Sequence, residues 1–316
     1  MTRPIILPLS QCTNLDLVGG KAVGLARLIA ADFSVPQGFC ITTEAYTQCL
    51  HASGFIEHEE WQKAFALSGN ERASALADCR DRIRRIETSQ LAAQCLPALQ
   101  ALSQPPNERW AVRSSATNED AAHTSFAGLY RTHLGVALSE IDTALKDLWT
   151  SLWEERVVSY QARQSNHTAP RMAVVVQPMV EAQSAGVAYS IHPVTGRSNQ
   201  VTINAVPGLA APLVDGTVKP DQYVVEVTDE GQPTRVRRRI LAHKSDRLTV
   251  SSEGLRTDPL SGATTLQSSL TDVQLFSLAR TAKHIERAFG QPMDLEWAFD
   301  TRQLWIVQAR PITAVR

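Results

Sequence analysis

The sequence lacks any run of about 18 apolar residues, and no long apolar stretch precedes a small-residue cleavage site near its start. A membrane-spanning helix and a secretory signal peptide are therefore not expected. A strong charge of one sign is also missing, because 31 Lys and Arg stand against 32 Asp and Glu. This near-neutral balance argues against a nucleic-acid partner.

Cysteine is scarce, and none of the five cysteines forms a Cys-x-x-Cys pair. An odd number of cysteines, all in the first third of a 316-residue chain, does not indicate a disulfide framework. The eight histidines make no ligand-spaced cluster with the cysteines, so a zinc site is not expected. Reduced thiols in a cytoplasmic protein are the favoured interpretation.

The hydrophobic periodicity changes along the chain. Helical spacing begins after Gly19-Gly20, whereas from residue 172 onward short apolar runs indicate strands. The length allows two subdomains with ample material for a core. We therefore predict an α+β protein with a helix-rich part over residues 1–185 and a sheet-rich part over residues 186–316. The predicted strands of the second half include 172–180, 186–191, 200–206, 222–227, 294–299 and 304–310.

Two segments carry patterns with a purely structural interpretation. Apolar residues recur in steps of three and four over 141–160, which predicts one amphipathic helix of about five turns with Trp149 and Trp153 in the core. The basic run at 235–239 lies in a strand-like segment. Charge of this kind is typical of a solvated edge strand, because it prevents further strands from adding to the sheet.

The first candidate site is the segment Gly19-Gly20-Lys21 at the start of a helix. It does not fit the Walker A or Gly-x-Gly-x-x-Gly patterns. Two glycines at a helix start still let backbone N–H groups approach an anion, and Lys21 adds positive charge. The alternative is a plain helix start with a solvated lysine.

The second candidate begins at Arg113, which ends a short predicted strand. A loop rich in Ser, Thr, Asn and Asp is expected from residue 114 to Gly128. Arginine holds phosphate through its planar fork, and a small-residue loop could fold over a polyphosphate. The alternative is an arginine paired with Glu119 or Asp120.

The third candidate is the closing hairpin, where Asp294 and Glu296 share one strand face and Gln308 and Arg310 share a face of the next strand. Carboxylate and carboxamide oxygens suit Mg²⁺, while arginine holds phosphate. A connection of odd length puts Glu296 and Gln308 on the same face, whereas an even one separates them. A salt-bridged hairpin without ligands is the alternative.

The fourth candidate is the apolar run 174–180, which contains Gln177-Pro178-Met179. A buried strand that meets proline leaves backbone groups unpaired near its end. Those groups could hydrogen-bond an adenine edge while Met179 packs on the ring. A plain core strand is the alternative.

Taken together, these segments resemble the N-terminal ATP-binding domain of the phosphoenolpyruvate synthase and pyruvate phosphate dikinase family, which rifampin phosphotransferases also carry. The resemblance covers nearly the whole chain. It rests on GGKAVGL (19–25), VPQGFCITT (35–43), AVRSSATNED (111–120), SFAGLYRT (125–132), MAVVVQPMV (172–180), AGVAYSIHPVTG (185–196), VKPDQY (218–223) and MDLEWAFD with IVQARPIT (293–313).

The resemblance implies an ATP-grasp-like fold in which two subdomains enclose a nucleotide cleft, with ATP and Mg²⁺ as cofactors. It implies that Lys21 and Arg113 hold the phosphates of ATP and that Arg310 contacts the phosphates that are transferred. By the same resemblance, Gly128 and Thr132 belong to the loop that covers the phosphates, Gln177, Met179 and Val180 border adenine, and Glu296 and Gln308 bind Mg²⁺.

The family makes AMP and phosphate from ATP and passes the β-phosphoryl group through a histidine on a swivelling domain. Here no histidine sits in the family's histidine context, and the chain stops soon after residue 313. The resemblance therefore implies a split enzyme, as in phenylphosphate synthase, in which a separate chain brings the phosphohistidine swivel and an acceptor domain for a small molecule such as a phenol. A self-sufficient kinase or ligase and a nucleotide sensor without turnover are the alternatives.

One position departs from the family pattern. The usual Gly-Leu-Gly-Glu loop appears as Gly208-Leu209-Ala210-Ala211. A carboxylate that is usual in this loop is therefore missing, and any contact that it makes in relatives is lost here.

Overall fold

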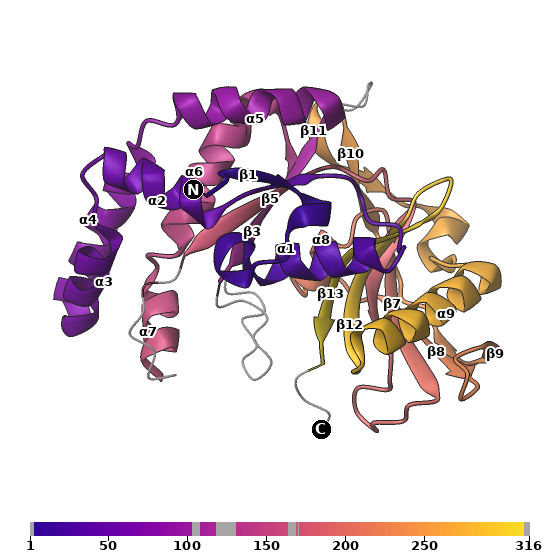
Figure 1. Cartoon of the computed structure of the whole chain (residues 1–316). Helices are drawn as coiled ribbons and strands as arrows, with labels where there is room; N and C mark the ends of the chain where they lie inside the picture. The colour runs from indigo at the N-terminus through magenta and orange to yellow at the C-terminus, as the bar shows by residue number, and fades with distance from the viewer. Residues whose placement is uncertain (1–2, 103–107, 118–130, 164–168, 170, 313–316) are drawn as a thin grey trace. The chain divides into compact units, whose positions relative to one another are not determined.

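The computed structural model describes residues 3–102, 108–117, 131–163, 169 and 171–312 (Figure 1). The chain divides into two compact units, of which unit 1 comprises Met1–Ala26 and Gln37–Pro178, and unit 2 comprises Arg27–Pro36 and Met179–Arg316. This boundary differs from the expected one between residues 185 and 186, since unit 2 begins at Met179 and also takes a short segment from the N-terminal half. The predicted α+β class is confirmed.

Unit 1 is built on a five-stranded antiparallel sheet in the order β1–β2–β5–β3–β4. Its strands are β1 (Ile6–Pro8), β2 (Phe39–Ile41), β3 (Trp110–Ala116), β4 (Thr132–Val136) and β5 (Met172–Pro178). Its helices are α1 (Leu15–Ala30, whose last turn belongs to unit 2), α2 (Thr43–Ala52), α3 (Glu57–Ala66), α4 (Gly69–Arg84), α5 (Ser89–Leu102), α6 (Ile141–Ser151) and α7 (Glu155–Arg163), with 3-10 turns η1 (Leu9–Gln11) and η2 (Leu138–Glu140).

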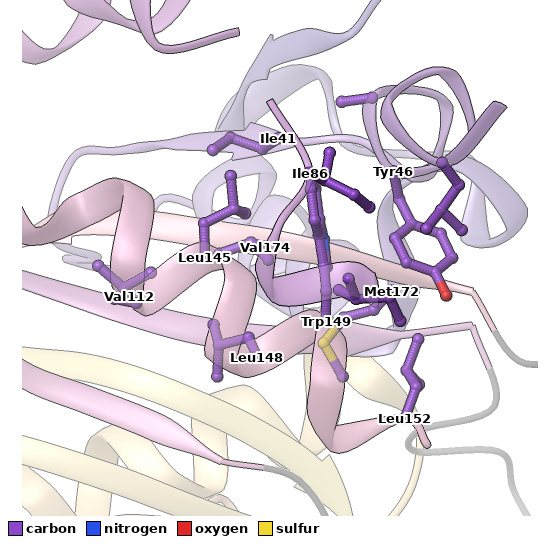
Figure 2. Close-up of a cluster of buried hydrophobic side chains, with 14 of the residues drawn as sticks. Ile41, Tyr46, Ile86, Val112, Leu145, Leu148, Trp149, Leu152, Met172 and Val174 are labelled. Carbon is purple, nitrogen blue, oxygen red and sulfur yellow. The ribbon is translucent and has the colours of Figure 1, made fainter. Parts of the chain in front are cut away.

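The core of unit 1 lies between one face of this sheet and the helices that connect β2 to β3 and β4 to β5. Helix α6 packs on β3, β4 and β5. Figure 2 shows Val112 of β3 and Val174 of β5 in the same buried cluster as Leu148 and Trp149 of α6. Alternate residues of β3 and β5 therefore face this core, and the residues between them face the other side of the sheet.

The apolar stripe predicted over 141–160 is buried, but it spans two helices rather than one. Helix α6 ends at Ser151 and α7 begins at Glu155. Trp149 and Trp153 are both buried, as predicted, and the Trp153 indole nitrogen donates a hydrogen bond to the Tyr46 hydroxyl at 3.1 Å. The break between the helices thus keeps its tryptophan in the core.

Unit 2 is built on a six-stranded antiparallel sheet in the order β13–β12–β6–β7–β8–β9. Helix α9 packs on β6, β7, β8, β9 and β12, and ends at Gly290 in the left-handed region (φ 72°) that favours glycine. The strands are β6 (Ser184–Tyr189), β7 (Gln200–Pro207), β8 (Asp221–Val227), β9 (Pro233–Ile240), β12 (Met293–Phe299) and β13 (Leu304–Pro311), and the helices are α8 (Ala211–Val214), η3 (Gly262–Leu266) and α9 (Asp272–Phe289).

Unit 2 also contains an edge strand that the sequence predicts and a hairpin that it does not predict. Strand β9 is the edge of the sheet, and its Arg235 and Arg237 both pair with Glu226. The separate hairpin of β10 (Asp246–Ser251) and β11 (Gly254–Pro259) is not predicted from the sequence pattern. In the part of the chain that the structure describes, no helix has the length and apolar character needed to cross a bilayer.

Candidate functional site

In unit 1, three of the predicted site residues project from one face of the sheet. On β3, Arg113 alternates with core-facing Val112, and on β5, Gln177 alternates with core-facing Val176. The two strands pair antiparallel, with Arg113 opposite Val175 and Ala111 opposite Gln177. Arg113 and Gln177 therefore lie on the same face, opposite the hydrophobic core, and their side chains are buried (6% and 3% exposed).

Helix α1 is held against this face at Ser115. The Ser115 hydroxyl donates to the Val18 carbonyl at 2.7 Å and accepts from the Ala22 N–H at 3.1 Å. Between these two contacts the chain leaves helical geometry at Gly19 (φ 73°, ψ 169°) and then resumes the helix. Lys21 lies in this first resumed turn and is 6% exposed, so it is brought to the face that carries Arg113.

Gly19 is required by a contact within the protein. A Cβ atom at this position would lie 2.0 Å from the Ser115 carbonyl oxygen, and φ is in the region that favours glycine. The sequence suggested a close approach of backbone to anion here, and the approach that the structure shows is of α1 to β3. The glycine therefore fixes where Lys21 lies relative to the strand of Arg113.

Of the two residues expected to cover the phosphates, the structure describes Thr132 but not Gly128. Thr132 begins β4 and pairs with Arg113 across the ladder, so the two side chains share a face. Gly128, and with it Glu119 and Asp120, falls outside the described residues. The predicted loop is wrong for residues 114–116, which continue β3.

In unit 2, Glu296 of β12 lies opposite Gln308 of β13. The connection between these strands, residues 300–303, has an even length, which by itself would place the two residues on opposite faces. The register shifts between Glu296 and Trp297, because Trp297 pairs with Ile306 and Val307 is an additional residue on β13. This β-bulge brings Gln308 opposite Glu296.

Arg310 is anchored beside this pair by Asp294, the residue opposite it on β12. Its Nε and Nη2 atoms lie 2.9 and 2.8 Å from the Asp294 Oδ2 atom. Burial raises the pKa of Asp294, the charge of Arg310 opposes this shift, and the charge of Glu296 adds to it. The other carboxylate oxygen, Oδ1, is buried and accepts no hydrogen bond from the described residues.

The sequence places Asp294 on the face of Glu296 but does not identify it as a site residue. Asp294 could be identified only from the register of the hairpin, because that register places it opposite Arg310, where its carboxylate binds the guanidinium. On the other side of β12, Asp294 pairs with Tyr189 of β6. Burial raises the pKa of the Tyr189 phenol, and the Asp294 charge raises it further while Arg310 lowers it.

The donor set of this hairpin fits a hard cation. Glu296 provides a carboxylate, Gln308 a carboxamide oxygen, and Asp294 the buried oxygen without a hydrogen bond. Oxygen donors of these kinds are the ligands that Mg²⁺ prefers. In the described part of the chain, this hairpin included, no group of three or more His, Cys, Asp or Glu side chains gathers around a point, so the third donor here is the Gln308 carboxamide.

The predicted adenine-side residues of unit 2 pack on a small apolar cluster. Met179 and Val180 are partly buried against Ala182, Ala185, Leu209 and Ala298. Leu209 belongs to the loop that departs from the family pattern, and Ala211 in that loop begins α8. Ala211 therefore presents only a methyl group in this loop.

The segment 218–223, which matches the family pattern, contains a buried ion pair. The Asp221 Oδ1 atom accepts hydrogen bonds from Lys244 Nζ at 2.7 Å and from the Ala242 N–H at 2.8 Å. Its Oδ2 atom accepts from the Ser269 N–H and hydroxyl at 2.8 and 2.7 Å, and from the Tyr223 hydroxyl at 3.2 Å. These contacts tie three chain segments together, which is a structural role.

Comparison with known proteins agrees with these observations. Residues 15–316 match the family described as pyruvate phosphate dikinase, AMP/ATP-binding domain. The chain belongs to this family. Its relatives include a phosphoenolpyruvate synthase of Aeropyrum pernix, which is 34% identical over 99% of this chain and 43% of its own length.

Two further relatives in the AMP/ATP-binding domain family carry other names. A rifampicin phosphotransferase of Bacillus subtilis is 33% identical over 96% of this chain and 35% of its own length. A prodigiosin-synthesizing transferase of Serratia marcescens is 34% identical over 99% of this chain and 34% of its own length. The chain thus spans less than half the length of these curated relatives. A solved D-alanyl-alanine synthetase A of Vibrio cholerae aligns over 97% of this chain and 59% of its own at 9% identity, with a TM-score of 0.35, too low to support an argument.

Proposed function

We propose that this chain binds ATP with Mg²⁺ and is the nucleotide module of a dikinase-type phosphotransferase. The observation that carries the proposal is the hairpin of β12 and β13, where a bulge brings Gln308 opposite Glu296 and the next outward-facing pair is Asp294 and Arg310. Metal-type oxygens and an anchored guanidinium side by side suit a metal–phosphate complex. Membership in a family of AMP/ATP-binding domains supports the same ligand.

The residues of unit 1 would hold the phosphates. Lys21 and Arg113 are buried cations, and Arg113 shares its sheet face with Thr132. Gly128 is expected beside them. Lysine and arginine form charge-assisted hydrogen bonds with phosphate oxygens, and arginine can do so through its planar fork. Gln177 would border the adenine on this unit.

The residues of unit 2 would hold the metal and the transferring groups. Glu296 and Gln308 would bind Mg²⁺, which when bound neutralises developing charge on the phosphate oxygens. Arg310 would contact the transferring phosphates, kept in place by Asp294. Met179 and Val180 would border the adenine. In this proposal, catalysis comes from electrostatic clamping and in-line positioning.

The proposed reaction converts ATP, water and an acceptor into AMP, phosphate and the phosphorylated acceptor. A histidine attacks the β-phosphorus atom and AMP leaves, so the histidine first carries both the β and γ phosphates. Water then breaks the bond between them and releases the γ-phosphoryl group as phosphate. The β-phosphoryl group then passes from the histidine to a small molecule, with a phenol as the first acceptor to test. We propose that the histidine belongs to a swivelling domain on a separate cytoplasmic chain.

The test uses ATP labelled separately in its β and γ phosphates. The purified chain is incubated with labelled ATP and Mg²⁺ alone, and then with a histidine-bearing protein encoded in an adjacent reading frame. Acid-labile label on that protein from β-labelled ATP only, with AMP formed only in the mixture, supports the proposal. Phosphorylation of small molecules by this chain alone, or ATP binding without turnover in every mixture, contradicts it.

A further inference from the structure

A cluster of charged side chains lies behind strand β4, on the face opposite Arg113. Arg131, the residue before β4, donates hydrogen bonds from Nη1 to both carboxylate oxygens of Asp147 at 2.9 Å. Its Nη2 atom donates to Glu154 at 2.6 Å. His133, two residues later, lies 2.8 Å from Asp147 through its Nε2 atom. One carboxylate of α6 therefore contacts two alternate residues of the β4 segment.

Successive side chains of an extended chain point to opposite faces, so this cluster also determines where the residue between Arg131 and His133 points. Arg131 and His133 project toward α6, so Thr132 between them projects to the other face. Thr132 pairs with Arg113, and the Ser114 N–H donates to the Arg131 carbonyl at 3.3 Å. The start of β4 is thus fixed by backbone pairing on one edge and by the Asp147 carboxylate on one face.

We infer that Asp147 is a positioning residue that sets Thr132 on the phosphate-binding face through Arg131 and His133. The inference rests on the proposed function, because it assumes that Thr132 contacts the nucleotide phosphates. The planar guanidinium of Arg131 binds Asp147 through Nη1 and Glu154 through Nη2, and this fork fixes the orientation of the side chain as well as its distance. Without Asp147, His133 loses this carboxylate partner and Arg131 keeps only Glu154, so the first residues of β4 are held less firmly and Thr132 is less precisely oriented on the face of Arg113.

The cluster is a built feature rather than an isolated surface pair. Asp147 lies in α6, which packs on β3, β4 and β5, so its carboxylate is carried by the helix that covers the core. Glu154 lies between α6 and α7 and is also held by Arg156 at 2.7 Å. The break between these helices, which the sequence does not predict, places Glu154 within reach of Arg131.

The experiment measures binding of MgATP and AMP by calorimetry to the full chain and to single and double variants. Asp147→Ala should weaken MgATP by about tenfold, the size expected for one oriented hydrogen bond, and AMP by clearly less. Arg131→Lys keeps the charge but lacks the fork, so it should reproduce most of the loss. Asp142→Asn, which removes an ion pair with Lys146 on the same helix, should change neither affinity.

A double-mutant cycle with Thr132→Val separates positioning from a general structural effect. If Asp147 acts through Thr132, adding Asp147→Ala to Thr132→Val should cost little beyond the single variant. Full additivity, or an equal loss for MgATP and AMP, overturns the positioning role, as does an unchanged affinity in both Asp147→Ala and Arg131→Lys. Failure of the wild-type chain to bind MgATP contradicts the proposed function itself and overturns both.

Discussion

Glu296 lies opposite Gln308 because Val307 is an additional residue on β13. In a regular ladder that continues from Trp297 and Ile306, Glu296 would face Val307, an apolar side chain without a donor oxygen. The bulge exchanges that valine for a carboxamide. A bulge next to a candidate site is a common way to re-aim a side chain, and here it assembles two oxygen donors.

Deletion of Val307 tests this interpretation of the hairpin. The shortened strand can pair regularly, with Trp297 opposite Ile306 and Glu296 still opposite Gln308, so MgATP affinity should fall by no more than a few-fold. The measurement is calorimetric titration of MgATP alongside a melting curve. Deletion of Ala309 is the matched control, because it removes a residue beyond the bulge and displaces Arg310 from Asp294. A severe loss for the Val307 deletion with the fold intact would contradict the register argument.

Replacement of Glu296 by Gln should remove the metal-binding charge with little change in stability. Glutamine has nearly the same shape as glutamate, and the side chain is partly exposed, so the substitution leaves no cavity. We expect the activation free energy of AMP formation to rise by about 2–4 kcal/mol, which is the cost of losing one charge-stabilising group. Raised Mg²⁺ concentration should recover part of the activity. A variant with full activity would show that Glu296 does not bind the metal.

Arg113 should respond differently to two substitutions. Arg113→Ala removes the phosphate clamp and should cost about 2–4 kcal/mol of barrier. Arg113→Lys keeps the charge but not the planar fork, so it should recover only part of that loss. Circular dichroism and the melting temperature check that both variants fold. Equal activity of the lysine variant and the wild type would mean that charge alone is needed.

The strands and their faces could be predicted from the sequence, but the contacts that complete the candidate site could not. The alternation in 293–299 places Asp294 and Glu296 on one face, and this is confirmed. The bulge at Val307 has no signal in composition, because valine fits a regular strand equally well. The partnership of Asp294 with Arg310 depends on that register, so it was missed as well.

Strand β3 shows a second limit of sequence interpretation. Ser114, Ser115 and Ala116 are small or hydroxyl-bearing, which favours a loop. They continue the strand because Ala116 faces the core and the Ser115 hydroxyl is satisfied by α1, through the Val18 carbonyl and the Ala22 N–H. A partner 93 residues away in sequence replaces the solvent that the composition suggests.

The ionisation of Asp294 should contribute to the pH dependence of the free energy of unfolding. Burial raises the pKa of this carboxyl above its ordinary value of about 3.9, so the folded state binds the proton more tightly than the unfolded chain. Unfolding therefore releases a proton in this range, and the contribution of Asp294 to stability falls as pH rises from about 4 through the raised pKa. Asp294→Asn cannot ionise and should show a smaller decline, measured by urea unfolding at several pH values.

Asp300 provides a control of opposite sign for this measurement. Burial alone would raise the pKa of Asp300, but hydrogen bonds from the Trp305 indole and the N–H groups of Gln303 and Arg302 outweigh it and lower the pKa. Its contribution is present above the unfolded value and is lost as pH falls. Asp300→Asn should therefore change the slope in the other direction. Parallel pH profiles for wild type and Asp294→Asn would contradict the assignment.

The ion pair of Asp221 and Lys244 should be the most sensitive polar contact of unit 2. Both side chains are buried (0% and 6% exposed), and the carboxylate accepts hydrogen bonds from two other chain segments. Asp221→Ala leaves the ammonium group buried without its carboxylate, which costs about 3–5 kcal/mol. Burial alone would raise the pKa of Asp221, but the hydrogen bonds from Lys244 and Ser269 lower it, so the stabilisation is lost as the solution becomes acidic.

The double variant Asp221→Asn with Lys244→Met distinguishes a cost of leaving a charge unpaired from a cost of losing the pair. It removes both charges and keeps one carboxamide oxygen, which can accept from the Ala242 N–H, whereas the Ser269 N–H, which binds the other oxygen of Asp221, loses its acceptor. We expect it to be more stable than Asp221→Ala, because replacing both members of a buried pair is commonly less damaging than removing one. Chemical unfolding of the full chain provides the comparison. A double variant no more stable than Asp221→Ala would show that the attraction between the charges, rather than the cost of an unpaired ammonium group, dominates at this position.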